Sequence, residues 1–255
     1  MKEEKVNYGN WISKKRVYVF FVISIILILI SLFPIFIVVR IGIIIFAGIS
    51  LLTFLIFLYF YIEFSKNNGE LQHKIRNIVL EKLNWNGNGK ALDIGTGSGT
   101  LAINLAKRFQ NAKVLGIDYW GVTWSFSKKM CEKNANLEGV GNRVVFEKAD
   151  ASNLPFNNEE FDVVVSSFVF HEISSIKDKK SLIKEAMRVL KKNGAFSIMD
   201  TFNNKRTYGN IEELKKEISK FGVKEIYYSD INTEIKLKRL MRITFKNSGL
   251  FYGQK

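Results

Sequence analysis

Two long uncharged runs open the pattern of hydrophobic and polar positions along the chain. No charged residue occurs over 17–39 or over 41–62, and Arg40 alone separates the runs. A bilayer core about 30 Å thick needs roughly 20 apolar residues in a helix, so each run predicts a membrane-spanning helix. The runs exceed the apolar core of a signal peptide, and no small-residue cleavage site follows them. A hairpin buried in a protein core is the alternative, but the remaining chain is too small to cover it.

Basic residues flank the two runs and predict their orientation. Residues 14–16, Lys-Lys-Arg, precede the first run, and Lys66 follows the second. Because basic flanks stay in the cytoplasm, both termini and everything after the second run are expected there. The chain would reverse between residues 33 and 42, where Pro34 cannot donate a backbone hydrogen bond. A shallower, re-entrant hairpin is the alternative to two full spans.

From residue 70 onward, short apolar segments alternate with amphipathic ones. Strands are predicted at 90–94, 113–117, 143–147, 161–166, 195–199 and 223–228 and within 244–253, and helices at 70–83, 101–109, 123–136, 179–190 and 211–221. This alternation predicts an α/β domain whose seven-stranded sheet is mainly parallel and ends in a hairpin pair. The predicted division is a membrane hairpin over 1–63 and a Rossmann-like domain over 64–255.

A glycine-rich turn follows the first of these strands. It reads Asp93-Ile94-Gly95-Thr96-Gly97-Ser98-Gly99-Thr100, and glycines allow backbone to lie directly against a ligand. A dinucleotide fingerprint would need its third glycine at position 100, where threonine stands. The Asp-x-Gly-x-Gly-x-Gly pattern instead resembles motif I of the class I methyltransferases, which use S-adenosylmethionine. That resemblance implies S-adenosylmethionine as the cofactor.

Later segments resemble the same family, so the resemblance covers residues 70–209. They are Leu154-Pro155-Phe156, the strand 161–165, and the segment 188–194, where Asn193 replaces a usual proline. These segments are similar to the subgroup that contains quinone C-methyltransferases and phosphatidylethanolamine N-methyltransferases. The resemblance is strongest to small, membrane-anchored bacterial members.

Residues at four strand ends are candidates for binding the cofactor, because ligands of this fold lie at the carboxyl ends of the strands. The candidates are Asp93, Gly95, Gly97, Gly99, Asp118, Tyr119, Asp150, Ala151 and Ser166. Asp118, 25 residues beyond Asp93, can accept hydrogen bonds from both ribose hydroxyls. Aspartates at such positions are also common turn residues.

The resemblance implies roles for the other candidates. The Asp150 carboxylate would lie near the adenine amine, the Ala151 N–H near an adenine ring nitrogen, and Ser166 beside the methyl group to be transferred. Tyr119 and the neighbouring Trp120 would form an adenine face or a wall of the acceptor pocket, or else pack in the core.

Two titratable residues just beyond the fourth strand are candidate catalytic bases. His171 titrates near neutral pH, and Glu172 follows it. The alternative is that His171 begins a helix and packs under the sheet. We expect no metal, since the chain has one cysteine, Cys131, and no metal-binding motif.

The chain is strongly basic, with a formal net charge of +14. Five Lys or Arg residues gather near the C-terminus: Lys236, Lys238, Arg239, Arg242 and Lys246. They either protect a sheet edge from pairing or lie against anionic headgroups. Nucleic acid is not the expected partner, because no Asn/Asp-Pro-Pro-Tyr motif follows the fourth strand, where residues 166–169 are Ser-Ser-Phe-Val.

Three functional hypotheses follow. The first is a membrane-anchored methyltransferase whose acceptor at the cytoplasmic face is a lipid or a lipophilic small molecule. The second is a tethered methyltransferase of a protein or soluble small molecule, and the third is an S-adenosylmethionine-binding sensor or scaffold without turnover. The sequence leaves open the acceptor, the methylated element and the oligomeric state.

Overall fold

The computed structural model describes residues 4–34, 36–121 and 126–255, which divide into two compact units. One unit is residues 9–73, and the other joins the segment up to Tyr8 to residues 74–255. The junction after His73 therefore lies ten residues beyond the boundary predicted at 63.

The smaller unit is an antiparallel helical hairpin made of α1 (Lys14–Ser31) and α2 (Ile37–Ser65), followed by the short η1 (Lys66–Gly69). The Oγ atoms of Ser24 and Ser50 are 3.0 Å apart between the helices. The Phe20 and Phe57 rings stack with centroids 5.4 Å apart. Small hydroxyl residues and aromatic packing are typical of helix pairs in apolar surroundings.

Only one helix in the described part of the chain, α2, is long and apolar enough to cross a membrane. The first turn of α1 is Lys14-Lys15-Arg16, which leaves residues 17–31 as its uncharged length. At 1.5 Å per residue these rise about 22 Å, less than the bilayer core of about 30 Å. Two membrane spans are therefore not shown, because α1 ends at Ser31 instead of continuing to Val39.

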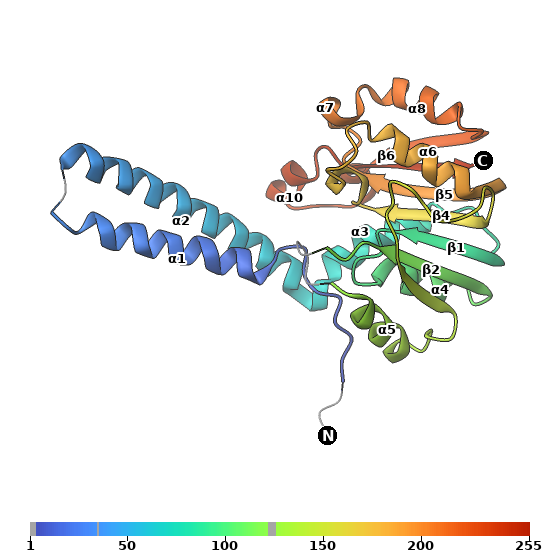
Figure 1. The fold of residues 1–255 in the computed structure, drawn as a ribbon, viewed down its shortest axis with the longest axis horizontal. Coiled ribbons are helices and arrows are strands. Elements are labelled where there is room, and N and C mark those ends of the chain that lie inside the picture. Colours follow the sequence, from blue (N-terminus) through green and yellow to red (C-terminus); the bar gives the residue numbers. More distant parts are fainter. Residues whose placement is uncertain (1–3, 35, 122–125) are drawn as a thin grey trace. The chain divides into compact units, whose positions relative to one another are not determined.

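The larger unit is built on a seven-stranded sheet in the order β3-β2-β1-β4-β5-β7-β6, which confirms the predicted fold (Figure 1). Its strands are β1 (Gly89–Ile94), β2 (Ala112–Asp118), β3 (Val144–Lys148), β4 (Phe161–Ser167), β5 (Leu190–Asp200), β6 (Glu225–Asp230) and β7 (Gly249–Gln254). The first five are parallel, and β7 is antiparallel to both of its neighbours. The inner strands are apolar on both faces, as in Val163-Val164-Val165, because helices cover both faces.

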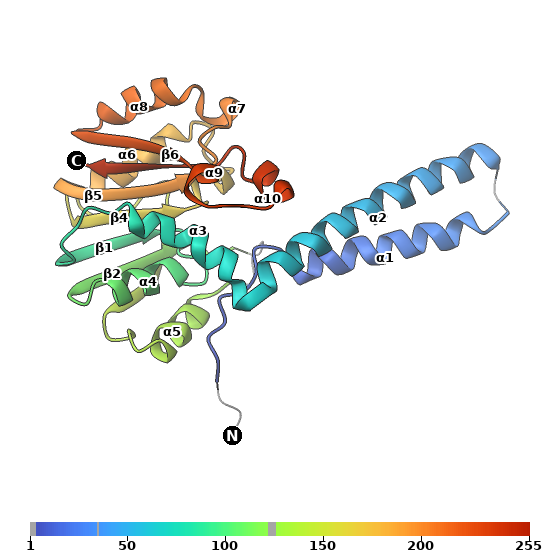
Figure 2. The same ribbon diagram turned by 180° about the vertical axis from the view of Figure 1, so that it is seen from behind.

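Helices cover the sheet on two sides (Figures 1 and 2). On one face lie α3 (Glu70–Glu81), α4 (Thr100–Arg108) and α5 (Lys128–Leu137), and on the other α6 (Lys180–Val189) and α8 (Ile211–Ser219). The shorter helices are η2 (Phe170–Glu172), α7 (Lys205–Tyr208), α9 (Ile231–Glu234) and α10 (Arg239–Thr244). The helix predicted from 123 begins at Lys128, where the Ser127 hydroxyl accepts a hydrogen bond from Met130 N. Residues 122–125 lie outside the described residues.

The antiparallel β7 decides where the connection between β6 and β7 lies. Gly249 pairs with Asp200, the last residue of β5, and with Asp230, the last residue of β6. Residues 231–248 therefore return to the edge of the sheet at which the parallel strands end. The outermost strands are β3 and β6, so β7 is paired on both sides.

Candidate functional site at the carboxyl edge of the sheet

The glycine turn between β1 and α4 is held against β2 by backbone hydrogen bonds. Gly95 N donates to Ile117 O at 2.8 Å, and Gly97 N donates to the Asp118 carboxylate at 2.8 Å. Gly95 and Gly97 both have positive φ, where glycine is favoured. A Cβ on Gly95 would lie 2.2 Å from Val169, whereas among the described residues a Cβ on Gly97 would meet only Phe126, at 3.5 Å. Gly95 is thus required by packing, and Gly97 is not crowded by any described residue.

Asp93 is buried beneath this turn, with 1% of its surface exposed. Its Oδ2 accepts hydrogen bonds from Thr96 Oγ1 at 2.7 Å and from Ala102 N at 3.1 Å. Burial raises the pKa of Asp93 to about 7, although these hydrogen bonds act in the opposite direction. Asp93 therefore fixes the turn to the start of α4, and its carboxylate does not face the solvent.

Asp118, at the end of β2, presents a half-buried carboxylate beside Gly97. Its oxygens accept hydrogen bonds from Gly97 N and, at 2.7 Å, from Trp120 N. A carboxylate has about four acceptor positions, so Asp118 retains acceptor capacity for a ligand. Trp120 Nε1 donates to Gly97 O at 3.0 Å, whereas Tyr119 is 63% exposed, with Lys148 Nζ 4.7 Å from its ring centre. Of these two aromatic residues, Trp120 is the one that forms a hydrogen bond with the turn.

The ends of β2 and β3 lie next to each other, so Asp150 and Ala151 fall at the same edge. Ala149 N donates to Asp118 O at 3.1 Å. Asp150 is exposed and its carboxylate accepts from Ser152 N at 2.8 Å, a local turn interaction. Ala151 is half-buried.

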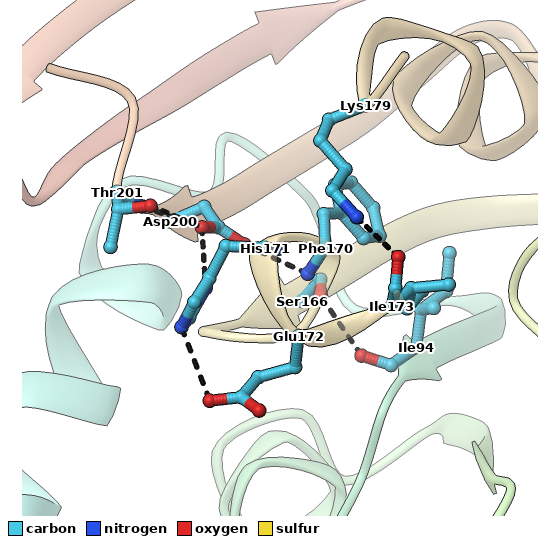
Figure 3. A network of polar contacts seen from close by, with 9 residues as sticks. All are labelled: Ile94, Ser166, Phe170, His171, Glu172, Ile173, Lys179, Asp200 and Thr201. Atoms are coloured by element: carbon cyan, nitrogen blue, oxygen red, sulfur yellow. Dashed lines mark hydrogen bonds and ion pairs between the residues drawn. The ribbon is translucent and has the colours of Figure 1, made fainter. Parts of the chain in front are cut away.

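The hydroxyl of Ser166 is engaged within the sheet. It is buried and donates to Ile94 O at 2.9 Å, which ties the end of β4 to the end of β1 (Figure 3). In this structure its hydroxyl holds two strands together.

His171 lies in η2, directly after β4, and is held by a buried carboxylate that the sequence reasoning missed (Figure 3). Its Nδ1 is 2.7 Å from Oδ1 of Asp200, and its Nε2 is 3.5 Å from Oε1 of Glu172. Asp200 is fully buried and also accepts hydrogen bonds from Phe170 N at 2.8 Å and Thr201 N at 2.6 Å. The signal was present in the sequence, because Asp200 is an acidic residue at the end of the fifth strand.

The charge state of His171 is set by these two carboxylates. Burial lowers the pKa of His171, but the hydrogen bonds and charges of Asp200 and Glu172 outweigh it and raise the pKa to about 9. At neutral pH the ring is therefore an imidazolium that donates hydrogen bonds. Burial and the nearby Asp200 charge also raise the pKa of Tyr208, so its hydroxyl stays protonated.

The segment before α1 also contributes to this unit. Asn7 and Asn134, in α5, exchange two hydrogen bonds of 2.9 Å, and Asn134 Nδ2 donates to Ser98 O in the glycine turn at 3.2 Å. Tyr8 donates through its hydroxyl to Glu138 at 2.9 Å. The sequence assigned these residues to the anchor, since nothing in their pattern indicates a distant partner.

The geometry fits the cofactor that the motif implies. S-adenosylmethionine has a ribose diol and no pyrophosphate, and the half-buried Asp118 carboxylate beside Gly97 is an acceptor of the kind that such a diol needs. Within the described ranges, no group of three or more His, Cys, Asp or Glu side chains could hold a metal ion.

Comparisons with known proteins agree with this assignment. Residues 92–198 match the family described as a methyltransferase domain. The ubiquinone/menaquinone biosynthesis C-methyltransferase of Desulfotalea psychrophila is 30% identical over 126 residues, which cover 49% of this chain and 47% of that protein. The demethylmenaquinone methyltransferase of Thermotoga maritima is 32% identical over 124 residues, 48% of each chain. The chain thus spans about half the length of these curated relatives.

A solved structure shares the fold. Phosphoethanolamine N-methyltransferase 2 of Haemonchus contortus is similar over 75% of this chain and 55% of its own, with a TM-score of 0.56 and 20% identity. The family match over residues 92–198, the strand order and the glycine turn together support an S-adenosylmethionine-dependent methyltransferase domain in this part of the chain.

Proposed function

We propose that this protein transfers the methyl group of S-adenosylmethionine to a lipid or lipophilic small molecule at the cytoplasmic face of a membrane. The observation that carries the proposal is that two pairs of residues lie at the same edge of the sheet. Asp118 and Gly97 offer a place for the cofactor, and His171, after β4, is paired with Asp200 at the end of β5.

The residues of the site divide between holding the cofactor and receiving the acceptor. Asp118 accepts hydrogen bonds from the ribose, and the turn from Gly95 to Gly99 lies under the cofactor. S-adenosylmethionine supplies an already activated methyl group, so the protein mainly contributes positioning and exclusion of water.

His171 serves first as a hydrogen-bond donor to the acceptor. Because its pKa is about 9, the protonated ring is suited to hold a polar or anionic oxygen of the acceptor. It can take a proton from the acceptor only after losing its own, and Glu172, half-exposed beside it, is the alternative base.

Two features favour an acceptor in the membrane. Helix α2 is long and apolar enough to cross a bilayer, and the relatives named above are named for quinones, which are lipophilic. We propose that the hairpin of α1 and α2 anchors the protein with both termini in the cytoplasm, through either two spans or a shallower, re-entrant hairpin. Lys14, Lys15 and Arg16 at the start of α1 support the cytoplasmic placement.

The experiment that tests this function supplies deuterated-methyl S-adenosylmethionine to the full-length protein in nanodiscs. Separate reactions receive a lipid extract or a soluble extract, and mass spectrometry follows S-adenosylhomocysteine and the labelled product. We expect turnover with the lipid extract, and none for Asp118→Ala with either extract. Turnover with the soluble extract alone would indicate a tethered enzyme for a soluble acceptor. Cofactor binding without turnover in either extract would indicate a sensor.

A further inference from the structure

The connection between β6 and β7, residues 231–248, has a large excess of positive charge. It contains five Lys or Arg residues and a single acid, Glu234. The Glu234 carboxylate lies 2.7 Å from Lys82 Nζ, so a lysine outside the connection already compensates it.

Basic and apolar side chains alternate on the exposed side of this connection. Leu240 and Ile243 in α10 are 42% and 54% exposed, whereas Met241 and Phe245 are buried. Four exposed basic residues surround this apolar pair, and within the described part of the chain they form no ion pair: Lys236, Arg239, Arg242 and Lys246. We refer to these four residues with Leu240 and Ile243 as the α10 surface.

The α10 surface belongs to the edge of the sheet that carries His171. Both views show α10 beyond the end of the sheet where β7 begins (Figures 1 and 2). The Phe245 ring, at the end of α10, lies 5.8 Å from the Phe168 ring, and the Phe168 ring lies 6.3 Å from the His171 ring. Two aromatic contacts therefore connect the end of α10 to His171.

Protection of a sheet edge does not explain these charges. The outermost strands are β3 and β6, and the basic residues lie on a helical connection that precedes the doubly paired β7. The basic residues therefore do not lie on either edge strand, where lysines would block pairing.

We propose that the α10 surface docks on anionic phospholipid headgroups and holds the His171 side of the site against the bilayer. The proposal rests on the proposed function, in which the acceptor lies in the membrane. An anionic leaflet attracts each nearby Lys or Arg, and exposed aliphatic side chains among them can enter the boundary between headgroups and acyl chains. Nucleic acid would also attract the charges, but single-stranded nucleic acid is held by aromatic stacking, and the exposed apolar residues here are Leu240 and Ile243.

The test places an environment-sensitive NBD fluorophore on Ile243→Cys in the full-length protein. The native Cys131 is buried, so the introduced thiol is the reactive one. The protein is reconstituted in nanodiscs of phosphatidylcholine alone or with phosphatidylglycerol, and quenching by doxyl-labelled lipids is measured. Lys192→Cys, an exposed residue near the opposite end of β5, is the matched control position.

We expect a blue shift and lipid quenching at position 243 in anionic discs only, lost at 1 M salt, where the Debye length is about 3 Å. Position 192 should show neither effect. Arg239→Gln with Arg242→Gln should reduce the docked-to-undocked ratio about 30-fold, about fivefold for each charge. Lysine at both positions should restore docking, because the headgroups respond to charge.

Two results would overturn the proposal. One is an unquenched probe at position 243 in anionic discs, and the other is equal quenching in discs without phosphatidylglycerol. A fluorescence change with single-stranded RNA but not with anionic discs would assign the α10 surface to nucleic acid instead. S-adenosylmethionine affinity, measured on the same samples, separates docking from the proposed function. The glutamine variants should retain it, and its loss would indicate misfolding.

Discussion

The imidazole of His171 and the carboxylate of Asp200 lie 2.7 Å apart and join the short helix after β4 to the last residue of β5. Asp200 is fully buried and also accepts backbone hydrogen bonds from Phe170 and Thr201, so its position is fixed. It thus orients the ring of His171 and maintains its proton. We regard Asp200 as a positioning residue, since it acts on the acceptor through His171.

Replacing Asp200 by asparagine should lower the pKa of His171 well below 9, because burial then opposes protonation with less compensation. The chain has two histidines, so NMR of imidazole nitrogens in a His73→Gln background reports His171 alone. Glu172→Gln serves as the comparison and should lower the pKa less. An unchanged titration in Asp200→Asn would contradict the assigned pair.

The pH dependence of turnover should follow the protonated form of His171. The pKa of His171 is about 9, so the ring loses its proton, and with it a hydrogen bond to the acceptor, as the pH rises through that value. We therefore expect kcat/KM to fall above pH 9. The contribution of the charged ring to the stability of the fold is complete below about pH 6.5, the pKa in the unfolded chain, and is lost over the same rise. A rise of kcat/KM through pH 9 would instead indicate that neutral His171 acts as the base.

Asp118→Ala and Ser166→Ala should separate cofactor binding from structure. Loss of the Asp118 carboxylate should weaken S-adenosylmethionine binding by about 2–4 kcal/mol, because it removes two charge-assisted hydrogen bonds. Calorimetry on the purified protein measures this, and unchanged affinity would remove Asp118 from the site.

Ser166→Ala should leave S-adenosylmethionine affinity within a factor of about two. Its buried hydrogen bond to Ile94 O should contribute about 1 kcal/mol to stability. A large loss of affinity in this variant, with stability unchanged, would restore the direct cofactor role predicted from the sequence.

Asp93 should make the fold less stable as the pH rises. Its folded pKa of about 7 exceeds the ordinary value of 3.8, so the folded state binds more protons between these values. Stability therefore falls on the order of 2–4 kcal/mol between about pH 4 and pH 8, a loss that Asp93→Asn should abolish. Thermal unfolding of both proteins over this range measures the effect, and parallel curves would exclude it.

The number of spans can be decided by labelling cysteines placed at Lys5, Leu32 and Lys255 with a membrane-impermeant maleimide. Two spans predict that only position 32, after α1, reacts from outside intact cells. A re-entrant hairpin predicts no external reaction at any position, and a single span would expose one terminus. Membranes opened with detergent provide the control for reactivity.

The positions of the strands were predictable because each strand is a short apolar run bounded by turn residues, as in Val163-Val164-Val165. The place of Asp118, at the end of β2 and beside the glycine turn, was predictable because it ends the second predicted strand. The anchor was predicted less well, because hydropathy gave the length of the uncharged run but not that α1 ends at Ser31. Asp93 and Ser166 were expected to face the cofactor, yet both are engaged by backbone groups, which depends on three-dimensional contacts. The segment at Asn7 could not be placed, since its partner lies 127 residues away.

Because β7 runs antiparallel between β5 and β6, the exposed side of the connection at residues 231–248 can change in sequence independently of the sheet. Gly249 pairs with both Asp200 and Asp230, so residues 231–248 leave and re-enter the sheet at one place. The charge of their exposed side chains can vary without shifting the register of any strand or moving Asp118, whereas Met241 and Phe245 are buried. Substitutions confined to residues 231–248 can thus change the surface on which the protein docks. The part of the domain that contains the glycine turn and Asp118 stays unchanged.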